Sequence, residues 1–194
     1  PISVDTYKAD VARAALAEGA SIVNDVSGLR RDGQLASVAA EMKAGVVLMH
    51  SRGQSDEMYA EAHYEDLVKE VGSELAASVD RALKAGLTRD HLIVDPGIGF
   101  AKRPAHSYGV FARIPELAEA LDRPLLVGPS RKSFMSRLTD EKNASQRVMG
   151  SLGGAVHAAL NGVHAIRVHD VEATRQTLAV VRAMVDPELS SSTA

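Results

Sequence analysis

The sequence predicts an α/β protein with a parallel sheet, because short β-branched runs alternate with helical segments along the chain. Six runs are predicted strands, namely residues 2–5, 21–25, 45–50, 92–95, 125–128 and 165–169. The segments between them are rich in Ala, Leu, Glu and Arg, which favour helices. A polar or small residue closes every run, and ligands bind at that edge of a parallel sheet.

Helical patterns follow the strands in order, and the clearest are 8–19, 67–86, 114–123 and 171–185. Gly19 and Gly86 stand where a glycine in left-handed conformation commonly ends a helix. We expect residues 1–185 to form one domain and residues 186–194 to be a disordered tail. The polar segment 51–63 is assigned no chemistry.

Composition excludes several classes of function. The 194 residues carry a net charge of -3, which provides no electrostatic footprint for nucleic acid or an acidic membrane. Aromatic residues make up only 4%, which argues against a stacking platform for single strands. There is no apolar run long enough to span a membrane. The absence of cysteine fits a reducing compartment, so we expect a cytoplasmic protein.

Two parallel architectures compete. An open doubly wound sheet is disfavoured because no G-x-G-x-x-G motif follows the first strand. Six strand-helix units average about 32 residues, so eight would need roughly 260, the size of a (β/α)8 barrel. Periodicity alone leaves both architectures open.

The residues that end the predicted strands are Asp5, Asn24, His50, Asp95, Gly128 and His169. Because the C-terminal ends of parallel strands meet at one edge, we expect these groups to converge on one concave site. Each Asp or Asn alone could instead cap the following helix or begin a turn.

The motif DPGIGFAK begins at Asp95, at the end of the fourth predicted strand. Pro96 restricts Asp95 to extended geometry. Gly97 and Gly99 then permit a tight loop. A rigid carboxylate there can accept two parallel N–H bonds from an amidine-like edge, and Phe100 is a candidate wall of the pocket. The alternative is an ordinary Asp-Pro-Gly turn, with Phe100 packed within the loop.

The segment LLVGPSRKSF leads from the fifth predicted strand into a predicted helix. Gly128 leaves room for a flat ligand, and Ser130 is the expected N-cap. A lysine in the first turn opposes the helix macrodipole, which indicates that Lys132 meets an acceptor. The amides near Ser133 are a candidate site for a carboxylate. The alternative is that Arg131 and Lys132 form a solvated basic pair.

Arg167 and His169 stand two residues apart in the sixth predicted strand, so they share one of its faces. A guanidinium and an imidazole on the same face suit a phosphate or pyrophosphate. The alternative is a salt bridge on an edge strand. Asp5, His50 and Asp95 could together form a metal site, but nothing in their spacing demands one.

Five segments in this order, SVDTYK, VNDVSG, DPGIGFAK, VGPSRKSF and RVHDV, resemble bacterial dihydropteroate synthases, the folate-pathway enzymes that sulfonamides target. The resemblance spans residues 1 to about 185. It implies a (β/α)8 TIM barrel, of which this sequence would hold the third to the eighth strand and lack the first two. It also implies a transferase that joins 6-hydroxymethyl-7,8-dihydropterin pyrophosphate to p-aminobenzoate, giving 7,8-dihydropteroate and pyrophosphate.

The same resemblance assigns the site residues. The pterin would be bound by Asp5, Asn24, Met49, Asp95, Phe100, Gly128 and Lys132. The p-aminobenzoate would be bound by Phe100, Lys132 and Ser133. Arg167 and His169 would bind the departing pyrophosphate together with Mg²⁺, and these two residues and Lys132 would be catalytic. The family's metal ligand would lie upstream, so no metal ligand is identified in this chain.

The resemblance further implies small-molecule substrates, no nucleic-acid or membrane partner, and a homodimer. A barrel without two of its strands has unpaired edges, so we expect the 194 residues alone to be inactive and poorly soluble. Two other functions remain: a non-catalytic pterin-binding paralogue, and a pterin-dependent methyltransferase of the same barrel superfamily. The methyltransferase should lack the motifs SRKSF and RVHD, which this sequence has.

Overall fold

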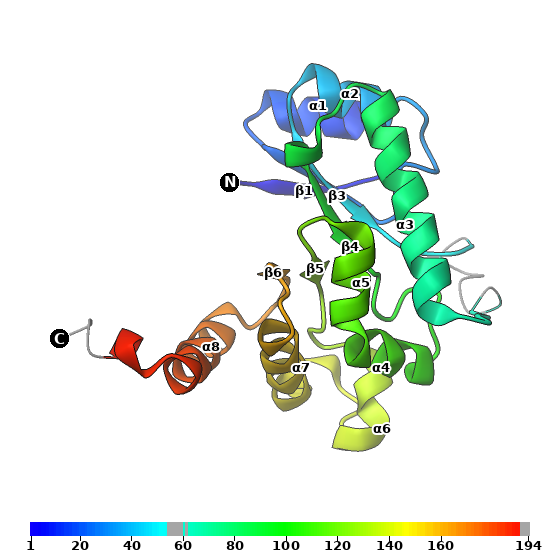
Figure 1. Ribbon diagram of the computed structural model, residues 1–194. Helices are drawn as coiled ribbons and strands as arrows, with labels where there is room; N and C mark the ends of the chain where they lie inside the picture. Colours follow the sequence, from blue (N-terminus) through cyan, green and yellow to red (C-terminus); the bar gives the residue numbers. More distant parts are fainter. Residues whose placement is uncertain (54–59, 61, 191–194) are drawn as a thin grey trace.

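The computed structural model describes residues 1–53, 60 and 62–190 (Figure 1). Its strands are β1 (Ser3–Asp5), β2 (Ile22–Asp25), β3 (Gly45–Met49), β4 (Leu92–Asp95), β5 (Leu126–Val127) and β6 (Ala165–Ile166). Each lies within a run predicted from the sequence, so the six predicted strands are confirmed.

The strands are neighbours in chain order. One parallel sheet has the order β1-β2-β3-β4, and β5 pairs with β6 in a second. A parallel bridge between Val94 and Leu125 joins the end of one sheet to the start of the other. A doubly wound sheet reverses its strand order at a switch point, whereas a barrel adds strands in one direction. The unbroken order therefore favours the barrel.

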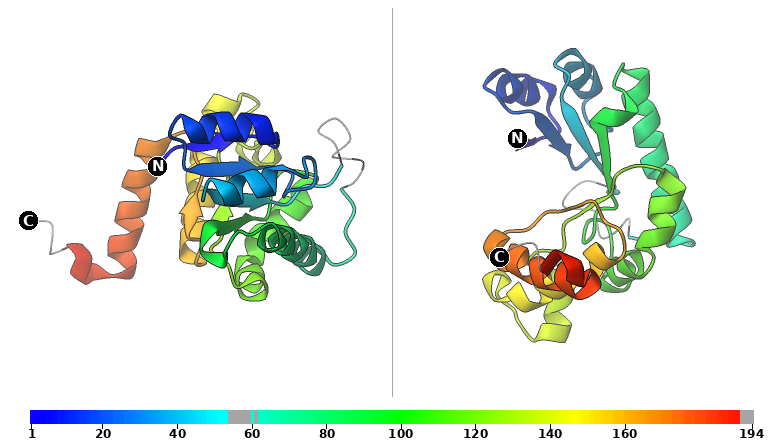
Figure 2. Two further views of the ribbon diagram at one scale, coloured as in Figure 1. Left: turned by 90° about the horizontal axis from the view of Figure 1, so that it is seen from above. Right: turned by 60° about the vertical axis from the view of Figure 1, so that its left-hand side comes forward.

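The helices lie on the outer side of the curved row of strands (Figure 2). They are α1 (Ala9–Ala17), α2 (Leu35–Glu41), α3 (Leu67–Lys84), α4 (Pro104–Ala112), α5 (Ile114–Leu121), α6 (Ser136–Thr139), α7 (Val148–Leu160) and α8 (Val171–Val185). Short 3-10 segments are η1 (Arg89–His91), η2 (Ser133–Met135), η3 (Ala144–Gln146) and η4 (Pro187–Ser190). Gly19 and Gly86 follow the C-caps of α1 and α3 with φ of 102° and 99°, as predicted.

The core lies between the strands and these helices. Its most buried strand residues, each at most 1% exposed, are Val23, Val46, Leu48, Val94 and Val127, and Leu125 directly before β5 is equally buried. The helices contribute Leu35, Leu75, Ile114 and Leu117, also at most 1% exposed. Burial of this kind on parallel strands holds the strand ends in fixed positions, and the candidate site is built on those ends.

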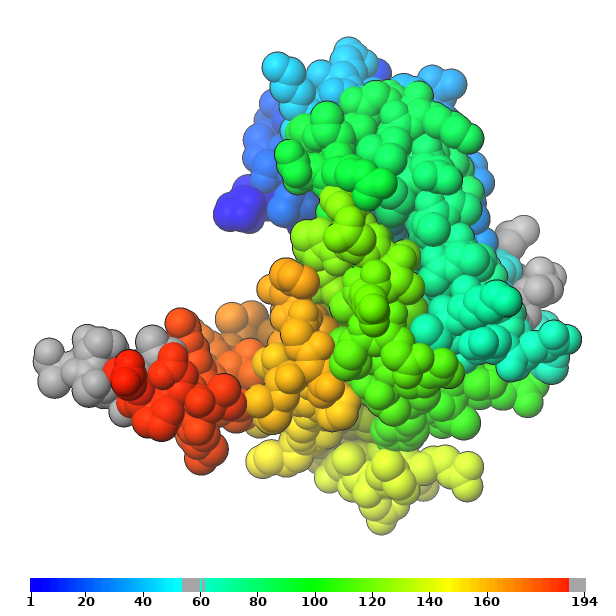
Figure 3. Space-filling view, viewed as in Figure 1, coloured from blue at the N-terminus to red at the C-terminus, as the bar shows by residue number. Residues whose placement is uncertain are grey.

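Helix α8 is mostly exposed and lies beside α7 at the edge of the molecule (Figure 3). Of its 15 residues, all of which the structure describes, only Thr174 is buried. Its exposed apolar residues are Val171, Val180, Met184 and Val185, with exposed fractions between 56% and 76%. No described helix is both long and apolar enough to cross a membrane.

Two predicted segments fall partly outside the described residues. In the segment 51–63, residues 54–59 and 61 are not described. In the tail 186–194, residues 187–190 form η4, and residues 191–194 lie outside the description. The disorder of that tail therefore stays a prediction.

Candidate ligand-binding site at the strand ends

Side chains from four strand ends form one hydrogen-bonded chain. Asn24 Nδ2 donates to Asp5 Oδ2 at 3.0 Å. Arg167 then donates from Nη1 to Asn24 Oδ1 at 2.8 Å and from Nη2 to Asp95 Oδ2 at 3.1 Å. These residues lie at or directly after the C-terminal ends of β1, β2, β4 and β6, so the structure brings their polar groups to one place.

A pocket of about 300 Å³ lies over this chain. Its lining residues are Asp5, Val26, Phe100, Gly128, Ser130, Lys132, Arg167, Val168 and His169. Of the other predicted site residues, Asn24, Met49 and Asp95 are buried, and Arg167 connects two of them to the pocket. Ser133 does not line the pocket and is exposed at the start of η2.

Asp95 combines the two arrangements that the sequence left open. Its Oδ1 accepts a hydrogen bond from the amide of Gly97 at 2.8 Å, as in an Asp-Pro-Gly turn. Its Oδ2 accepts from the Arg167 guanidinium, as expected of a carboxylate in a binding site. Burial raises the pKa of Asp95, while Arg167 and the Gly97 amide oppose that rise. The carboxylate thus depends on its hydrogen-bond donors for its charge.

Gly97 is required by the space around it. Its φ is 65°, and a Cβ at this position would lie 1.8 Å from the carbonyl oxygen of His50. Only glycine lets the chain after β4 pass this close to the end of β3.

The loop after β5 corrects one prediction. Ser130 is not a helix N-cap: its Oγ accepts a hydrogen bond from the amide of His169 at 3.1 Å. Arg131 adopts a left-handed conformation with φ of 58°, which separates Ser130 from the helical turn that begins at Ser133. Lys132 takes the N-cap position of that turn.

The predicted strand 165–169 is also too long, because β6 ends at Ile166. The Arg167 amide still donates to the Val127 carbonyl at 2.9 Å, in the manner of a strand. Two residues later, the His169 amide donates to the Ser130 side chain and not to a backbone carbonyl of β5. Arg167 and His169 therefore follow the strand, yet both line the pocket.

Arg131 and Lys132 are not a solvated basic pair. Arg131 pairs with Asp170 through two hydrogen bonds of 2.6 and 3.1 Å. Lys132 lies on the pocket side, with Nζ 4.0 Å from the centroid of the Phe100 ring. Burial lowers the pKa of Lys132 to about 8, with Asp95 opposing this effect and Arg167 adding to it. The ion pair of Arg131 anchors the loop that carries Lys132.

The Ser130 hydroxyl also lies within hydrogen-bond distance of the His169 ring. Because Ser130 Oγ already accepts from the His169 amide, its proton is available to His169 Nδ1 at 2.9 Å. A neutral imidazole that accepts at Nδ1 carries its proton on Nε2. His169 can therefore offer an N–H donor to an anionic ligand.

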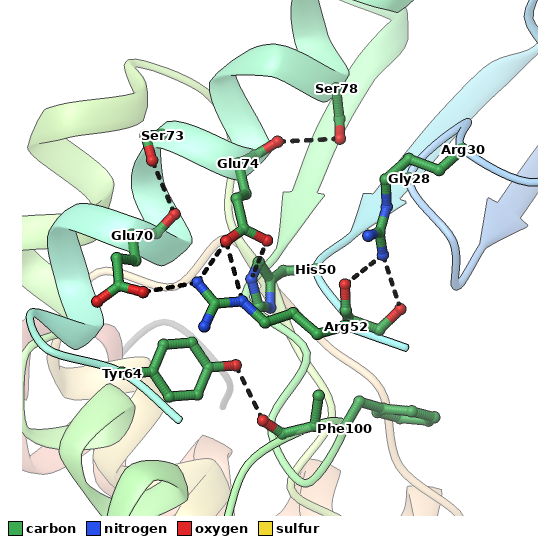
Figure 4. A network of polar contacts seen from close by, with 12 residues as sticks. Gly28, Arg30, His50, Arg52, Tyr64, Glu70, Ser73, Glu74, Ser78 and Phe100 are labelled. Carbon is green, nitrogen blue, oxygen red and sulfur yellow. Dashed lines mark hydrogen bonds and ion pairs between the residues drawn. The ribbon is translucent and has the colours of Figure 1, made fainter. Parts of the chain in front are cut away.

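Sequence reasoning missed a buried polar network beside the pocket. Lys102 is 1% exposed, and its Nζ lies 2.8 Å from His50 Nδ1. His50 Nε2 in turn lies 3.1 Å from Glu74 Oε2, and Arg52 pairs with the same carboxylate (Figure 4). The sequence carries no signal for this network, because Lys102 and His50 are 52 residues apart and His50 and Glu74 are 24 apart.

A second pocket, of about 380 Å³, is lined mostly by apolar residues of α4, η2, α6 and α7. Its lining contains no Asp, Glu, Lys or Arg among the described residues. The pocket at the strand ends is the candidate site, because it lies where polar groups from four strand ends are joined by hydrogen bonds.

The strands are in barrel order, and the polar pocket lies at their C-terminal ends, which is where TIM-barrel enzymes have their active sites. The family model described as "pterin binding enzyme" matches residues 1–169, and the chain belongs to this family. Within the described residues, no group of three or more His, Asp or Glu side chains could hold a metal ion.

The curated relatives include dihydropteroate synthases. The chain is 42% identical over 184 residues to that of Synechocystis sp., covering 95% of this chain and 63% of the relative. It is 44% identical over 193 residues to that of Mycobacterium leprae, covering 94% and 66% respectively. The chain thus spans a little less than two thirds of these relatives' length.

Solved structures of dihydropteroate synthase share the fold. That of Thermus thermophilus in complex with 4-aminobenzoate has a TM-score of 0.88 at 41% identity, over 94% of this chain and 70% of that one. The same enzyme in complex with 6HMPPP has a TM-score of 0.90 at 41% identity, over 95% and 72%. These matches confirm the predicted TIM-barrel fold class.

Proposed function

We propose that this chain carries the active-site residues of a dihydropteroate synthase, which joins 6-hydroxymethyl-7,8-dihydropterin pyrophosphate to p-aminobenzoate. The observation that carries the proposal is the pocket lined by Arg167, Lys132 and His169, in which Arg167 also donates a hydrogen bond to the buried carboxylate of Asp95. The two Thermus thermophilus structures, named for 4-aminobenzoate and for 6HMPPP, support this choice of substrates.

The aminopyrimidine edge of the pterin presents parallel N–H donors, which match Asp95 and the Asn24 side chain. In this structure the Arg167 guanidinium, which is also planar and has parallel N–H groups, occupies both acceptors. The incoming pterin would replace the guanidinium there, with Asp5, Met49, Gly128 and Phe100 around it. Arg167 would then be free to bind the pyrophosphate group.

The reaction breaks the C–O bond between the pterin methylene and pyrophosphate and forms a C–N bond to the arylamine. Pyrophosphate leaves with the bonding electron pair, and the arylamine loses a proton. Arg167 and His169 would stabilise the negative charge on the leaving group, and Lys132 would contact the carbonyl side of the pterin. Departure would precede attack, as in an SN1-like reaction. Positioning and preorganised charge would supply the catalysis without a covalent enzyme intermediate.

For p-aminobenzoate, we propose Phe100 and Lys132 as the walls of its site and the amides at Ser133 as the donors to its carboxylate. Ser133 is an exposed residue at the start of η2 in this structure.

Mg²⁺ is the proposed cofactor, and it would help to neutralise the negative charge of the pyrophosphate. The described residues do not themselves provide a set of carboxylates or imidazoles for a metal, so no step is assigned to the ion. A homodimer and a cytoplasmic location complete the proposal, together with residues 1–185 as the pterin-binding barrel domain.

The proposal is tested by measuring dihydropteroate formation by the full-length protein from the two substrates. Arg167→Ala and Lys132→Ala should each lower kcat/KM by about 100-fold or more, because each removes a charge aimed at the reacting groups. Lys84→Ala, an exposed lysine of α3, is the matched control. Near-normal activity of both site variants would remove the proposed roles.

The same preparation separates the alternative functions. Pterin binding without turnover by the unaltered protein would identify a non-catalytic paralogue. Transfer of a methyl group from a methylated pterin would identify a methyltransferase.

A further inference from the structure

Lys102 is a fully buried lysine that the proposed reaction does not use. It ends the loop between β4 and α4, is 1% exposed, and does not line the pocket. Its Nζ lies 2.8 Å from His50 Nδ1 and 3.2 Å from the carbonyl oxygen of Phe100. A lysine at such a place requires partners, and its partners connect it to helix α3 and back to its own loop.

The first connection leads through His50 to helix α3. The amine of Lys102 donates to His50 Nδ1, so the neutral ring carries its proton on Nε2 and donates it to Glu74. Burial lowers the pKa of His50 to about 4, which keeps the ring neutral. Burial alone would raise the pKa of Glu74, but the bonds from His50 and Arg52 lower it to about 2. Glu74 is therefore a permanent acceptor.

The second connection leads from Glu74 back to the same loop. Arg52 Nε donates to Glu74 Oε1 at 2.9 Å, and the Arg52 guanidinium lies 4.1 Å from the centroid of the Tyr64 ring (Figure 4). The Tyr64 hydroxyl donates to the carbonyl oxygen of Ala101 at 2.9 Å. We call His50, Arg52, Tyr64, Glu74 and Lys102 the carbonyl clamp, because two of its members hold the successive carbonyls of Phe100 and Ala101.

This part of the loop needs to be held. Ala101 has φ of 47° and is fully buried, and a left-handed conformation is unfavourable for a residue with a Cβ. The preceding Phe100 places its ring 4.0 Å from Lys132 Nζ, at the wall of the pocket. The orientation of that ring thus depends on a strained segment whose two carbonyl groups the clamp holds.

We propose that Lys102 is a positioning residue, which acts through the carbonyl clamp to hold the Phe100 ring against Lys132 on the p-aminobenzoate side of the pocket. This role rests on the proposed function for its substrate, but the geometry of the ring can be measured without turnover. Lys102 itself does not touch substrate, so its loss should affect binding of p-aminobenzoate more than the chemical step.

The kinetic test uses Lys102→Met and Tyr64→Phe in the full-length protein, because they release the two carbonyls separately. Each should raise KM for p-aminobenzoate, by about tenfold for Lys102→Met, with a smaller change in kcat. Lys84→Met is the matched control. Thermal unfolding shows whether each variant is folded. If Lys102→Met does not fold, Tyr64→Phe still tests the proposal, because it removes one hydroxyl only.

A double variant shows whether Lys102 acts through Phe100. In a Phe100→Ala background, Lys102→Met should add little to KM, because the ring that it positions is gone. A full additional effect in that background, or an unchanged KM in both single variants, would overturn the proposal.

An independent readout is fluorine NMR of protein labelled with fluorophenylalanine. Phe100, Phe111 and Phe134 are the phenylalanines of this chain, and Phe100→Leu assigns the first signal. Lys102→Met should shift or broaden the Phe100 signal and leave the other two unchanged. If the unaltered protein has no turnover, the proposed function fails, but this spectrum still tests the positioning role of Lys102. An unchanged Phe100 signal in Lys102→Met would overturn that role.

Discussion

Asp95 is a buried carboxylate whose charge depends on two donors. It is 1% exposed, and burial raises its pKa against the effects of Arg167 and the Gly97 amide. The Arg167 side chain is 39% exposed, so water screens part of this ion pair. The pair therefore contributes more to the shape and charge of the pocket than to overall stability.

Arg167→Met should lower the free energy of unfolding by about 1 kcal/mol at neutral pH, because a buried carboxylate then lacks its cation. A raised folded-state pKa stabilises the protein below the unfolded pKa and no longer does so at pH values above the folded pKa. The loss should accordingly shrink towards about pH 4, where protonated Asp95 needs no cation. Denaturant titrations at both pH values test this.

The control for that variant is the double substitution Arg167→Met with Asp95→Asn, which removes the charge as well as its partner. It should recover part of the stability at neutral pH. An equal loss at both pH values, without recovery in the double variant, would contradict the assignment.

Lys132 determines the expected behaviour on the alkaline side. Burial lowers its pKa to about 8, and the proposed role requires the cation, which is the form lost as pH rises. The pH profile of kcat/KM should therefore fall above about pH 8. In Lys132→Arg the cation persists at every accessible pH, so the kcat/KM that remains should no longer fall above about pH 8. The same fall in both proteins would assign it to another group.

At the scale of elements, the chain after β4 passes the end of β3 at a distance that only glycine permits. A Cβ on Gly97 would lie 1.8 Å from the His50 carbonyl oxygen, and the backbone there has positive φ. Gly97→Ala should lower the free energy of unfolding by about 3 kcal/mol or more, since both the contact and the conformation are unfavourable.

Gly33→Ala is the matched control, because nothing lies within 4 Å of a Cβ at that position. It should change stability by less than about 1 kcal/mol. Denaturant titration compares the two. Similar stabilities for both variants would mean that the chain at Gly97 moves away from β3 without cost.

The loop after β5 shows why the sequence placed the start of a helix too early there. The letters RKSF have helical propensity, but Arg131 pairs with Asp170, which is 39 residues away. That pair and the hydrogen bond between the Arg131 amide and Ser151 fix Arg131 in a left-handed conformation. A long-range contact thus overrides a local preference.

At the scale of the whole molecule, buried bases should make stability depend on pH. Burial lowers the pKa of Lys102 to about 7, and lowers that of His50 to about 4 with Lys102 adding to the effect. The charged and titratable groups around Lys102 are His50, Arg52, Tyr64, Glu74, Asp95, His106 and Lys132.

A base with a lowered folded-state pKa stabilises the protein above its unfolded pKa and loses that contribution as pH falls through the folded value. The contribution of Lys102 should therefore be lost between about pH 10.4 and 7, and that of His50 between about pH 6.5 and 4. Lys102→Met should remove the first loss, which is on the order of a few kcal/mol. Denaturant titrations across this range measure both. Parallel pH profiles for the two proteins would contradict the buried position of Lys102.

Helix α8 leads to a prediction about association. Its exposed apolar residues include Val180 and Met184, which are four residues apart and so share one face. We expect the 194-residue chain to associate as its concentration rises, because contiguous exposed apolar surface favours contact. Met184→Glu should reduce association in light scattering, whereas Ala179→Glu adds the same charge on another side of α8 and should have less effect. A monomer at every concentration would contradict this expectation.

The sequence predicted more of the fold than of the site. Strand positions came from β-branched runs, because local patterning decides which segments become strands. The strand-end residues Asp5, Asn24 and Asp95 were identified for the same reason. Their hydrogen-bond partners were not, because Arg167 is 143 residues from Asn24 and 72 from Asp95.

The sequence by itself determined the parallel α/β class, the six strands and the residues at their ends, since these depend on neighbours along the chain. Only the tertiary structure decided what those residues bond to. It joined Arg167 to Asp95, ended β6 early through Ser130, and buried Lys102 beside His50. Such pairings depend on distances between segments far apart in the chain, and no local pattern encodes them.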